Sequence, residues 1–96
     1  MNAIAKIKEY KLSEVVASKG IELTPNGRDK YKCLCPFHND SNPSLIVDDR
    51  SGRFKCWSCG AKGDSIKFEE QYEQVETREA VGSLCKHFDI EFENTE

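Results

Sequence analysis

The amino-acid sequence predicts a small α+β fold, in which an antiparallel β-sheet is flanked by helices from both ends of the chain. Three observations lead to this prediction. Short runs that alternate apolar and charged residues fill the centre of the chain, helical periodicity marks both ends, and two pairs of metal-binding side chains stand between them. With 96 residues, 38% of them hydrophobic and 32% charged, one domain with little core material is expected, and such domains commonly need a disulfide or a metal.

Two pairs of side chains have the spacing of a structural metal site. Two residues separate Cys35 from His38, two separate Cys56 from Cys59, and seventeen lie between the pairs. Four sulfur and nitrogen ligands favour zinc over hard cations, and a full set of protein ligands leaves no position for a catalytic water. We therefore predict one structural Zn²⁺ ion and a zinc-ribbon fold. The alternatives are a redox pair or incidental thiols, and Cys33 could compete as a ligand, although we expect it to be a small buried thiol.

The cysteine count also indicates the cellular compartment. Five cysteines cannot all pair as disulfides, no apolar signal segment follows Met1, and no apolar run approaches the length of a membrane span. Clustered cysteines in a reducing compartment are more often metal ligands than disulfides. The sequence therefore favours a cytoplasmic location without a membrane partner.

Charge is distributed unevenly along the chain, although the formal net charge is only −3. Residues 28–67 carry eight Lys or Arg and five Asp, whereas residues 68–96 carry two basic and nine acidic residues. A basic centre with an acidic flank predicts one binding face rather than a uniformly charged particle.

Apolar residues recur at helical spacing over residues 2–18 and predict a helix there. Ser13 is a candidate N-cap for a shorter helix that begins at Glu14, and Gly20 is a candidate C-terminal stop. We expect residues 1–11 to be frayed.

Four strands are predicted in the centre, at residues 21–24, 28–34, 44–48 and 53–56, with an Asn-Gly turn after the first. In the second and fourth strands, cationic residues alternate with apolar or thiol-bearing ones, so each strand has a charged and an uncharged face. The run Leu45-Ile46-Val47 is apolar without interruption, which predicts a strand covered on both faces.

Two helices are predicted after the second ligand pair. Asp64 is a candidate N-cap for a helix that begins at Ser65. A second helix is expected from Thr77, itself a possible cap. Its apolar stripe consists of Ala80, Val81, Leu84, Cys85 and Phe88. Residues 91–96 are expected to form a frayed acidic end.

Further short motifs surround the ligand pairs. They are Cys-Pro-Phe-His at 35–38, Asn39-Asp40, Pro43-Ser44, Val47, Phe54, Cys56-x-x-Cys59-Gly60, Gly63-Asp64, and Ile66 with Phe68. In this combination the chain resembles the zinc-binding domain of DnaG-type bacterial and phage primases, over about residues 12–90. A generic zinc ribbon has no reason to share the Pro-Phe-His and Pro-Ser elements. The resemblance implies that residues 1–96 form a single domain of this kind.

The resemblance implies a zinc ribbon of antiparallel strands flanked by helices. It also implies a domain that contacts single-stranded template DNA and helps to select where RNA primers begin. Cys35, His38, Cys56 and Cys59 fall on the ligand positions of that family.

This sequence departs from the family pattern at three points. Leu45 stands where the family commonly has an aromatic residue, and the turn at 24–29 has fewer basic residues than usual. The chain also ends where a primase would continue into its polymerase domain, whose carboxylates hold Mg²⁺. We therefore expect a module without catalytic residues of its own, either an accessory domain or the N-terminal part of a longer primase.

The alternation of side chains along the strands suggests how DNA would bind. The cationic residues could share one sheet face if the second and fourth strands pair, and such a face would follow a phosphate backbone. They are Arg28, Lys30, Lys32, Arg53 and Lys55. Trp57, between the ligands of the second pair, is the candidate for stacking on bases. Possible partners besides DNA are a separate primase polymerase subunit or a helicase. The alternative is a zinc-stabilised module that docks on a replication or transcription protein.

Overall fold

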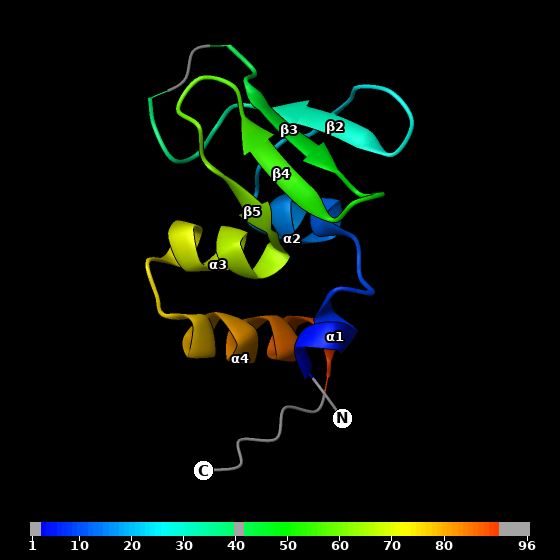
Figure 1. The fold of residues 1–96 in the computed structure, drawn as a ribbon, viewed down its shortest axis with the longest axis vertical. Helices are drawn as coiled ribbons and strands as arrows, with labels where there is room; N and C mark the ends of the chain where they lie inside the picture. The colour runs from blue at the N-terminus through cyan, green and yellow to red at the C-terminus, as the bar shows by residue number, and fades with distance from the viewer. Residues whose placement is uncertain (1–2, 40–41, 91–96) are drawn as a thin grey trace.

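The computed structural model describes residues 3–39 and 42–90, and it shows a five-stranded antiparallel sheet with four helices (Figure 1). The elements are α1 (Ala3–Ile7), α2 (Leu12–Ser18), β1 (Thr24–Pro25), β2 (Lys30–Cys33), β3 (Leu45–Asp48), β4 (Arg53–Cys56), β5 (Lys62–Asp64), α3 (Ser65–Glu73) and α4 (Thr77–Phe88). The strands follow each other in sequence order across the sheet. The predicted α+β class with an antiparallel sheet and flanking helices is confirmed.

The helices form layers on one side of the sheet. Helix α2 contacts β3 and α3, α3 contacts α4, and α1 contacts α4 (Figure 1). None of the helices in the described part of the chain is long and apolar enough to span a membrane.

The N-terminal region differs from the single helix that periodicity predicted, because α1 and α2 are separate helices. Residue Ile7 at the end of α1 is fully buried, and the ring of Tyr10 stacks on Phe88 with centroids 4.2 Å apart. Where we expected fraying over residues 1–11, the described part therefore contains a packed helix. Residues 1–2 and the acidic end at 91–96 lie outside the described residues.

Ser13 does not cap a helix, since α2 already begins at Leu12. Its backbone N–H and its hydroxyl donate to the two carboxylate oxygens of Asp49, at 2.8 and 2.6 Å. These bonds tie the first turn of α2 to the turn between β3 and β4. Gly20 follows α2 with a φ of +83°, as expected of a helix stop.

The sheet has one buried and one open face. Direct partners across antiparallel strands lie on the same face. The inner face carries Cys33, Leu45 and Cys56 in one row and Tyr31, Val47 and Phe54 in the next. All of these except Tyr31 are buried, and they pack towards the helices.

The prediction that β3 is covered on both faces is wrong. Leu45 and Val47 are fully buried, but Ile46 is only half-buried and lies on the outer face. The first strand is also shorter than predicted, because β1 contains only Thr24 and Pro25. The apolar run therefore predicted the strand correctly. Whether one or both faces of that strand are covered depends on how the helices pack on the sheet, which the run alone does not determine.

The two C-terminal helices begin close to where they were predicted. The carboxylate of Asp64 accepts the N–H of Lys67 at 2.9 Å, so Asp64 is the N-cap of α3. Helix α4 begins at Thr77, but Thr77 is not its cap: its hydroxyl donates to Glu70 at 2.5 Å and Glu76 holds the N-cap position. The predicted stripe of α4 is buried except for the partly buried Phe88.

A buried ion pair links α2 to α3. The Glu69 side chain is only 2% exposed, and its Oε1 lies 2.7 Å from Lys19 Nζ. At this distance the Lys19 ammonium and the Glu69 carboxylate form a close ion pair. Glu73 adds a second carboxylate at 3.0 Å. Burial alone would lower the pKa of Lys19, but Glu69 and Glu73 outweigh burial and raise that pKa above its ordinary value of 10.5.

We predict that Lys19→Met destabilises the fold by about 3 kcal/mol, because the Glu69 carboxylate would stay buried without its counter-charge. Urea unfolding at pH 7, followed by circular dichroism, measures this. The matched control is Lys86→Met on the exposed surface of α4. Because the pKa of Lys19 is raised, the stabilisation by this ion pair is fully present below about pH 10.5 and is lost as the pH rises through the raised pKa. Equal stabilities for the two variants would contradict this role.

Candidate metal centre and nucleic-acid interface

Four potential ligands converge at one end of the sheet. Cys35, His38, Cys56 and Cys59 each bring one ligand atom into a group whose members all lie within 4.8 Å of one another. They come from two short segments, one after β2 and one at the end of β4, which lie on either side of β3 in the sheet.

The spacing of these atoms fits tetrahedral zinc. Zinc–sulfur bonds of about 2.3 Å place two sulfurs of a tetrahedron about 3.8 Å apart, and a zinc–nitrogen bond shortens the mixed edge to about 3.6 Å. The Cys35 and Cys59 sulfurs are 3.8 Å apart, and His38 Nε2 lies 3.4 Å from the Cys56 sulfur. The four side chains therefore fit one structural zinc ion, and Nε2 is the ring nitrogen of His38 that faces it.

Backbone geometry shapes the second ligand pair. The N–H of Gly60 donates to the Cys56 carbonyl at 2.9 Å, and the N–H of Cys59 points to the Cys56 sulfur at 3.4 Å. Gly60 has a φ of +84°, a left-handed backbone conformation that is unfavourable for residues with a side chain. The Trp57 N–H donates to the Ser44 carbonyl at 3.0 Å, which fixes this turn to the segment before β3.

The thiols of the cluster differ in acidity before a metal binds. Burial raises the pKa of Cys35 to about 12. Burial would raise the pKa of Cys56 as well, but hydrogen bonds from the Cys59 N–H, the His38 ring and the Ser58 N–H hold it at about 6. The hydrogen bonds therefore favour the thiolate at Cys56, whereas burial favours the protonated thiol at Cys35, whose proton has to leave when zinc binds.

The two remaining cysteines are buried, as expected from the sequence. Cys33 and Cys85 are buried in the hydrophobic core, and neither belongs to the ligand group. Phe37, between the first two ligands, turns into the core as well. Its ring centroid lies 5.8 Å from that of Phe54 and 5.3 Å from that of Phe68.

The outer face of the sheet gathers cations from three strands. In one row across the sheet, Lys30 of β2 lies opposite Asp48 of β3, which in turn lies opposite Arg53 of β4. In the next row, Lys32, Ile46, Lys55 and Lys62 follow one another across β2 to β5. Strands β2 and β4 do not pair with each other, contrary to the assumption made from sequence; β3 lies between them and brings both cationic sides to one face.

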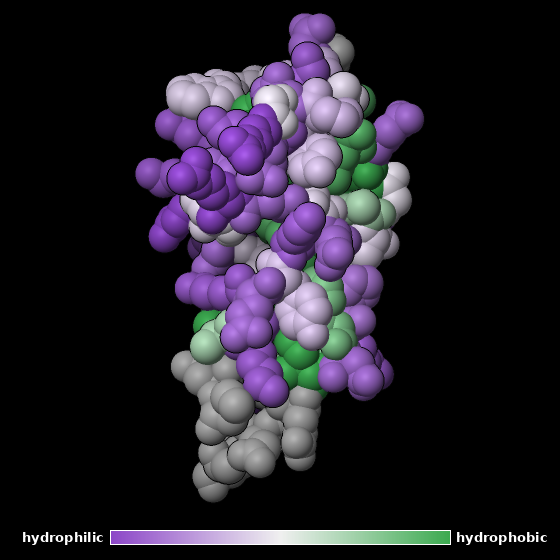
Figure 2. All heavy atoms as spheres, turned by 90° about the vertical axis from the view of Figure 1, so that its right-hand side faces the viewer, coloured by the Kyte–Doolittle hydropathy of each residue, from purple (hydrophilic) through white to green (hydrophobic). Residues whose placement is uncertain are grey.

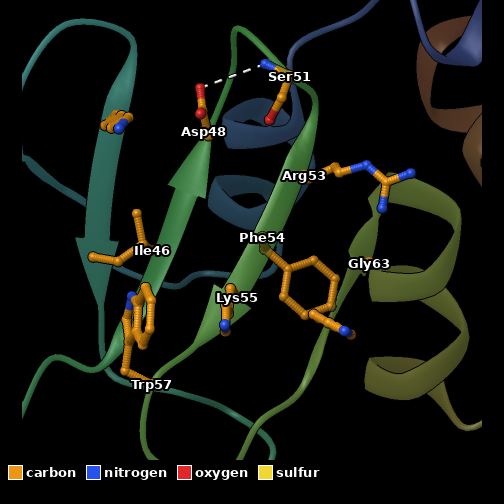
Figure 3. A pocket seen from close by; sticks show the side chains of 10 residues that line it. Ile46, Asp48, Ser51, Arg53, Phe54, Lys55, Trp57 and Gly63 are labelled. Carbon is orange, nitrogen blue, oxygen red and sulfur yellow. Dashed lines mark hydrogen bonds between the residues drawn. The ribbon is translucent and has the colours of Figure 1, made fainter.

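Trp57 stands at the end of this face and is 70% exposed. The Lys55 ammonium lies 4.2 Å from the centre of its ring. Figure 3 shows Trp57, Ile46 and Lys55 together, with Arg53 at the far side reaching towards α3. They belong to a shallow pocket of about 270 Å³, which we call the sheet pocket. Its lining consists of Lys30, Ile46, Asp48, Ser51, Arg53, Phe54, Lys55, Trp57, Lys62 and Gly63.

Two of the predicted DNA-binding residues lie away from this pocket. Arg28 is exposed in the turn before β2, and Lys32 faces a second hollow beside the first ligand pair. Sequence reasoning missed Lys62 and Ile46. Strand β5 has only three residues and contains Gly63, so it shows no alternation of apolar and polar residues. The sequence therefore gave no indication that Lys62 lies on a strand. The half-exposure of Ile46 depends on which sheet face the helices leave open.

We predict that Cys35→Ala abolishes stoichiometric zinc binding, whereas Cys33→Ala leaves one zinc per chain. The reason is that the Cys35 sulfur belongs to the tetrahedral group and the neighbouring Cys33 thiol is packed in the core. Elemental analysis of the purified variants measures the ratio. A Cys33→Ala protein without zinc, or a Cys35→Ala protein that still holds one tightly, would assign the ligands differently.

Comparison with known proteins agrees with this geometry. A family model described as the CHC2 zinc finger, a DnaG zinc ribbon, matches residues 1–96. The DNA primase of Mycoplasma genitalium is 32% identical over 88 residues, which cover 92% of this chain and 14% of that protein. The DNA primase of Thermotoga maritima is 39% identical over 88 residues, covering 92% and 15%.

The structural comparison gives the same result. The crystal structure of the Aquifex aeolicus primase, which contains zinc-binding and RNA polymerase domains, matches with a TM-score of 0.84 and 33% identity. The match covers 97% of this chain and 23% of that one. This chain spans about one seventh of the length of the curated primases it matches. By its sequence, its fold and its ligand group, the chain belongs to the CHC2 zinc-finger family of DnaG-type primases.

Proposed function

We propose that this chain is a non-catalytic module that binds single-stranded template DNA during primer synthesis in DNA replication. The observation that carries the proposal is the outer face of the sheet, where Lys30, Arg53, Lys55 and Lys62 surround a half-exposed Ile46 and an exposed Trp57. This face combines the two features by which proteins hold single strands, namely cations for phosphates and an aromatic ring for bases.

The two features have different tasks. The lysines and Arg53 neutralise phosphates, an attraction that does not depend on base sequence. Trp57 offers a ring on which a base can stack, and Ile46 extends the apolar floor beside it. The Lys55 ammonium already lies over the Trp57 ring, so a base would stack on the other side of the ring or displace this cation.

Zinc acts here as a structural cross-link. When bound, it holds the segments that follow β2 and β4 at the spacing on which the sheet face depends, and all four positions are filled by protein. Three reduced thiols also fit the cytoplasm, where we place this function. The Aquifex primase carries an RNA polymerase domain beside its zinc-binding domain. We expect nucleotide joining to occur in such a domain, in the same chain or in a separate subunit.

The second candidate function is docking on a replication protein, such as the polymerase subunit or a helicase. It is favoured by the exposed acidic side chains of Glu73, Glu76 and Glu79 around α3 and α4. DNA binding and docking are separated by titrating the chain with oligonucleotides and with the partner protein at two salt concentrations. Partner binding without DNA binding would favour docking.

We predict that Lys30→Ala and Lys55→Ala each lower the slope of log affinity against log salt by about 0.7 for single-stranded DNA, as expected for one lost phosphate contact. Lys32→Ala should have the same effect if the strand also passes the hollow beside the first ligand pair. Fluorescence anisotropy of labelled oligonucleotides measures these slopes. Lys86→Ala on α4 removes the same charge elsewhere and should leave the slope unchanged. Unaltered slopes in all variants would place DNA elsewhere.

We predict that oligonucleotides quench the fluorescence of Trp57, the single tryptophan of the chain. Trp57→Phe should keep most of the affinity, and Trp57→Ala should cost about 1–3 kcal/mol, because the stacking ring is lost. Equal affinity of the Ala and Phe variants would rule out stacking at this position.

A further inference from the structure

A second groove begins where the sheet pocket ends. It lies between α1, the edge strand β5, α3 and the start of α4, and we call it the helix-side groove. Its volume is about 620 Å³. It shares Arg53, Lys62 and Gly63 with the sheet pocket, so the two hollows adjoin along β5.

The helix-side groove carries an excess of accessible positive charge. Lys8, Arg53, Lys62 and Lys67 all line it and are all exposed. Its lining also includes two acidic residues, so four cations against two carboxylates leave a formal charge of +2. Asp64 caps α3 and lies 3.5 Å from Lys8, and the Glu70 carboxylate accepts the Thr77 hydroxyl.

Gly63, which carries no side chain, is one of the residues at which the two hollows meet. A β-carbon on Gly63 would lie 2.5 Å from the Cβ and Cγ atoms of Lys67. The aliphatic stem of Lys67 therefore occupies the space beside Gly63 that a side chain from β5 would need. Figure 2 shows how hydrophilic side chains gather over the upper, sheet-bearing half of one side of the molecule.

We propose that a single DNA strand bound in the sheet pocket continues across β5 into the helix-side groove, where Lys8 and Lys67 contact its phosphates. This proposal rests on the proposed function and extends it. The occupant follows from charge complementarity and from the adjoining lining. Among the residues that the structure describes, no aromatic side chain lines the helix-side groove, so the contacts proposed there are to the DNA backbone and do not depend on base sequence. Bases stack only on Trp57, and the helix-side groove increases the affinity for oligonucleotides long enough to reach it.

Oligonucleotides of two lengths test this path. We would measure the affinity of the zinc-loaded chain for labelled dT4 and dT12 between low and moderate NaCl concentrations. In Lys8→Ala/Lys67→Ala, the salt slope for dT12 should fall by about 1.4, which corresponds to two contacts. The slope for dT4, which fills only the sheet pocket, should stay as in the wild type, and this also shows that the variant is folded.

The control is Lys11→Ala/Lys86→Ala, which removes two exposed charges that line neither hollow. It should bind both oligonucleotides as the wild type does. An unchanged dT12 slope in Lys8→Ala/Lys67→Ala, or an equal loss for dT4 and dT12, would overturn the continued path while leaving the sheet pocket in place. If the wild type binds neither oligonucleotide in a salt-dependent way, the proposed function fails, and the path fails with it.

Discussion

The tetrahedral ligand group is the constraint on which the rest of the structure depends. The sheet is built from strands of two to four residues, and such strands hold together weakly on their own. Zinc joins the segment after β2 to the end of β4 across the intervening β3, at the point where Cys35 and Cys56 are buried. Structural zinc sites bind with about 10–16 kcal/mol in small peptides, which is comparable to the whole stability of a typical domain.

The same constraint couples the fold to the recognition surface. Trp57 lies inside the Cys56–Cys59 turn, and its backbone is bonded to Ser44. The backbone position of Trp57 is therefore held by the metal turn and by the segment before β3. Lys55, one residue before Cys56, reaches the face of that ring. A change in the ligand group would consequently disturb stacking as well as stability.

Much of this arrangement could be predicted from sequence because it is local. The ligand pairs, the alternation in residues 53–56 and the cap at Asp64 are set by neighbours a few positions apart, and the structure agrees with them. The missed features depend on distant segments. Ser13 bonds to Asp49 instead of capping a helix, Ile46 is left open by the helix layer, and β3 separates the two cationic strands.

The two adjoining hollows follow from the same long-range arrangement. Arg53 and Lys62 are nine residues apart in sequence but lie on neighbouring strands, where both can face the sheet pocket and the helix-side groove. A sequence pattern that treats each strand separately finds cations but not the path that connects them. In the helix-side groove, four cationic side chains outnumber the carboxylates of Asp64 and Glu70, which leaves that part of the path positively charged.

Zinc binding should hold together the sheet that carries the recognition face. The most direct test is thermal unfolding followed by circular dichroism, before and after removal of the metal with a strong chelator under reducing conditions. We predict that the metal-free chain loses its β-sheet signal and its cooperative transition, and that one equivalent of zinc restores both. An unchanged cooperative melt without zinc would contradict the account.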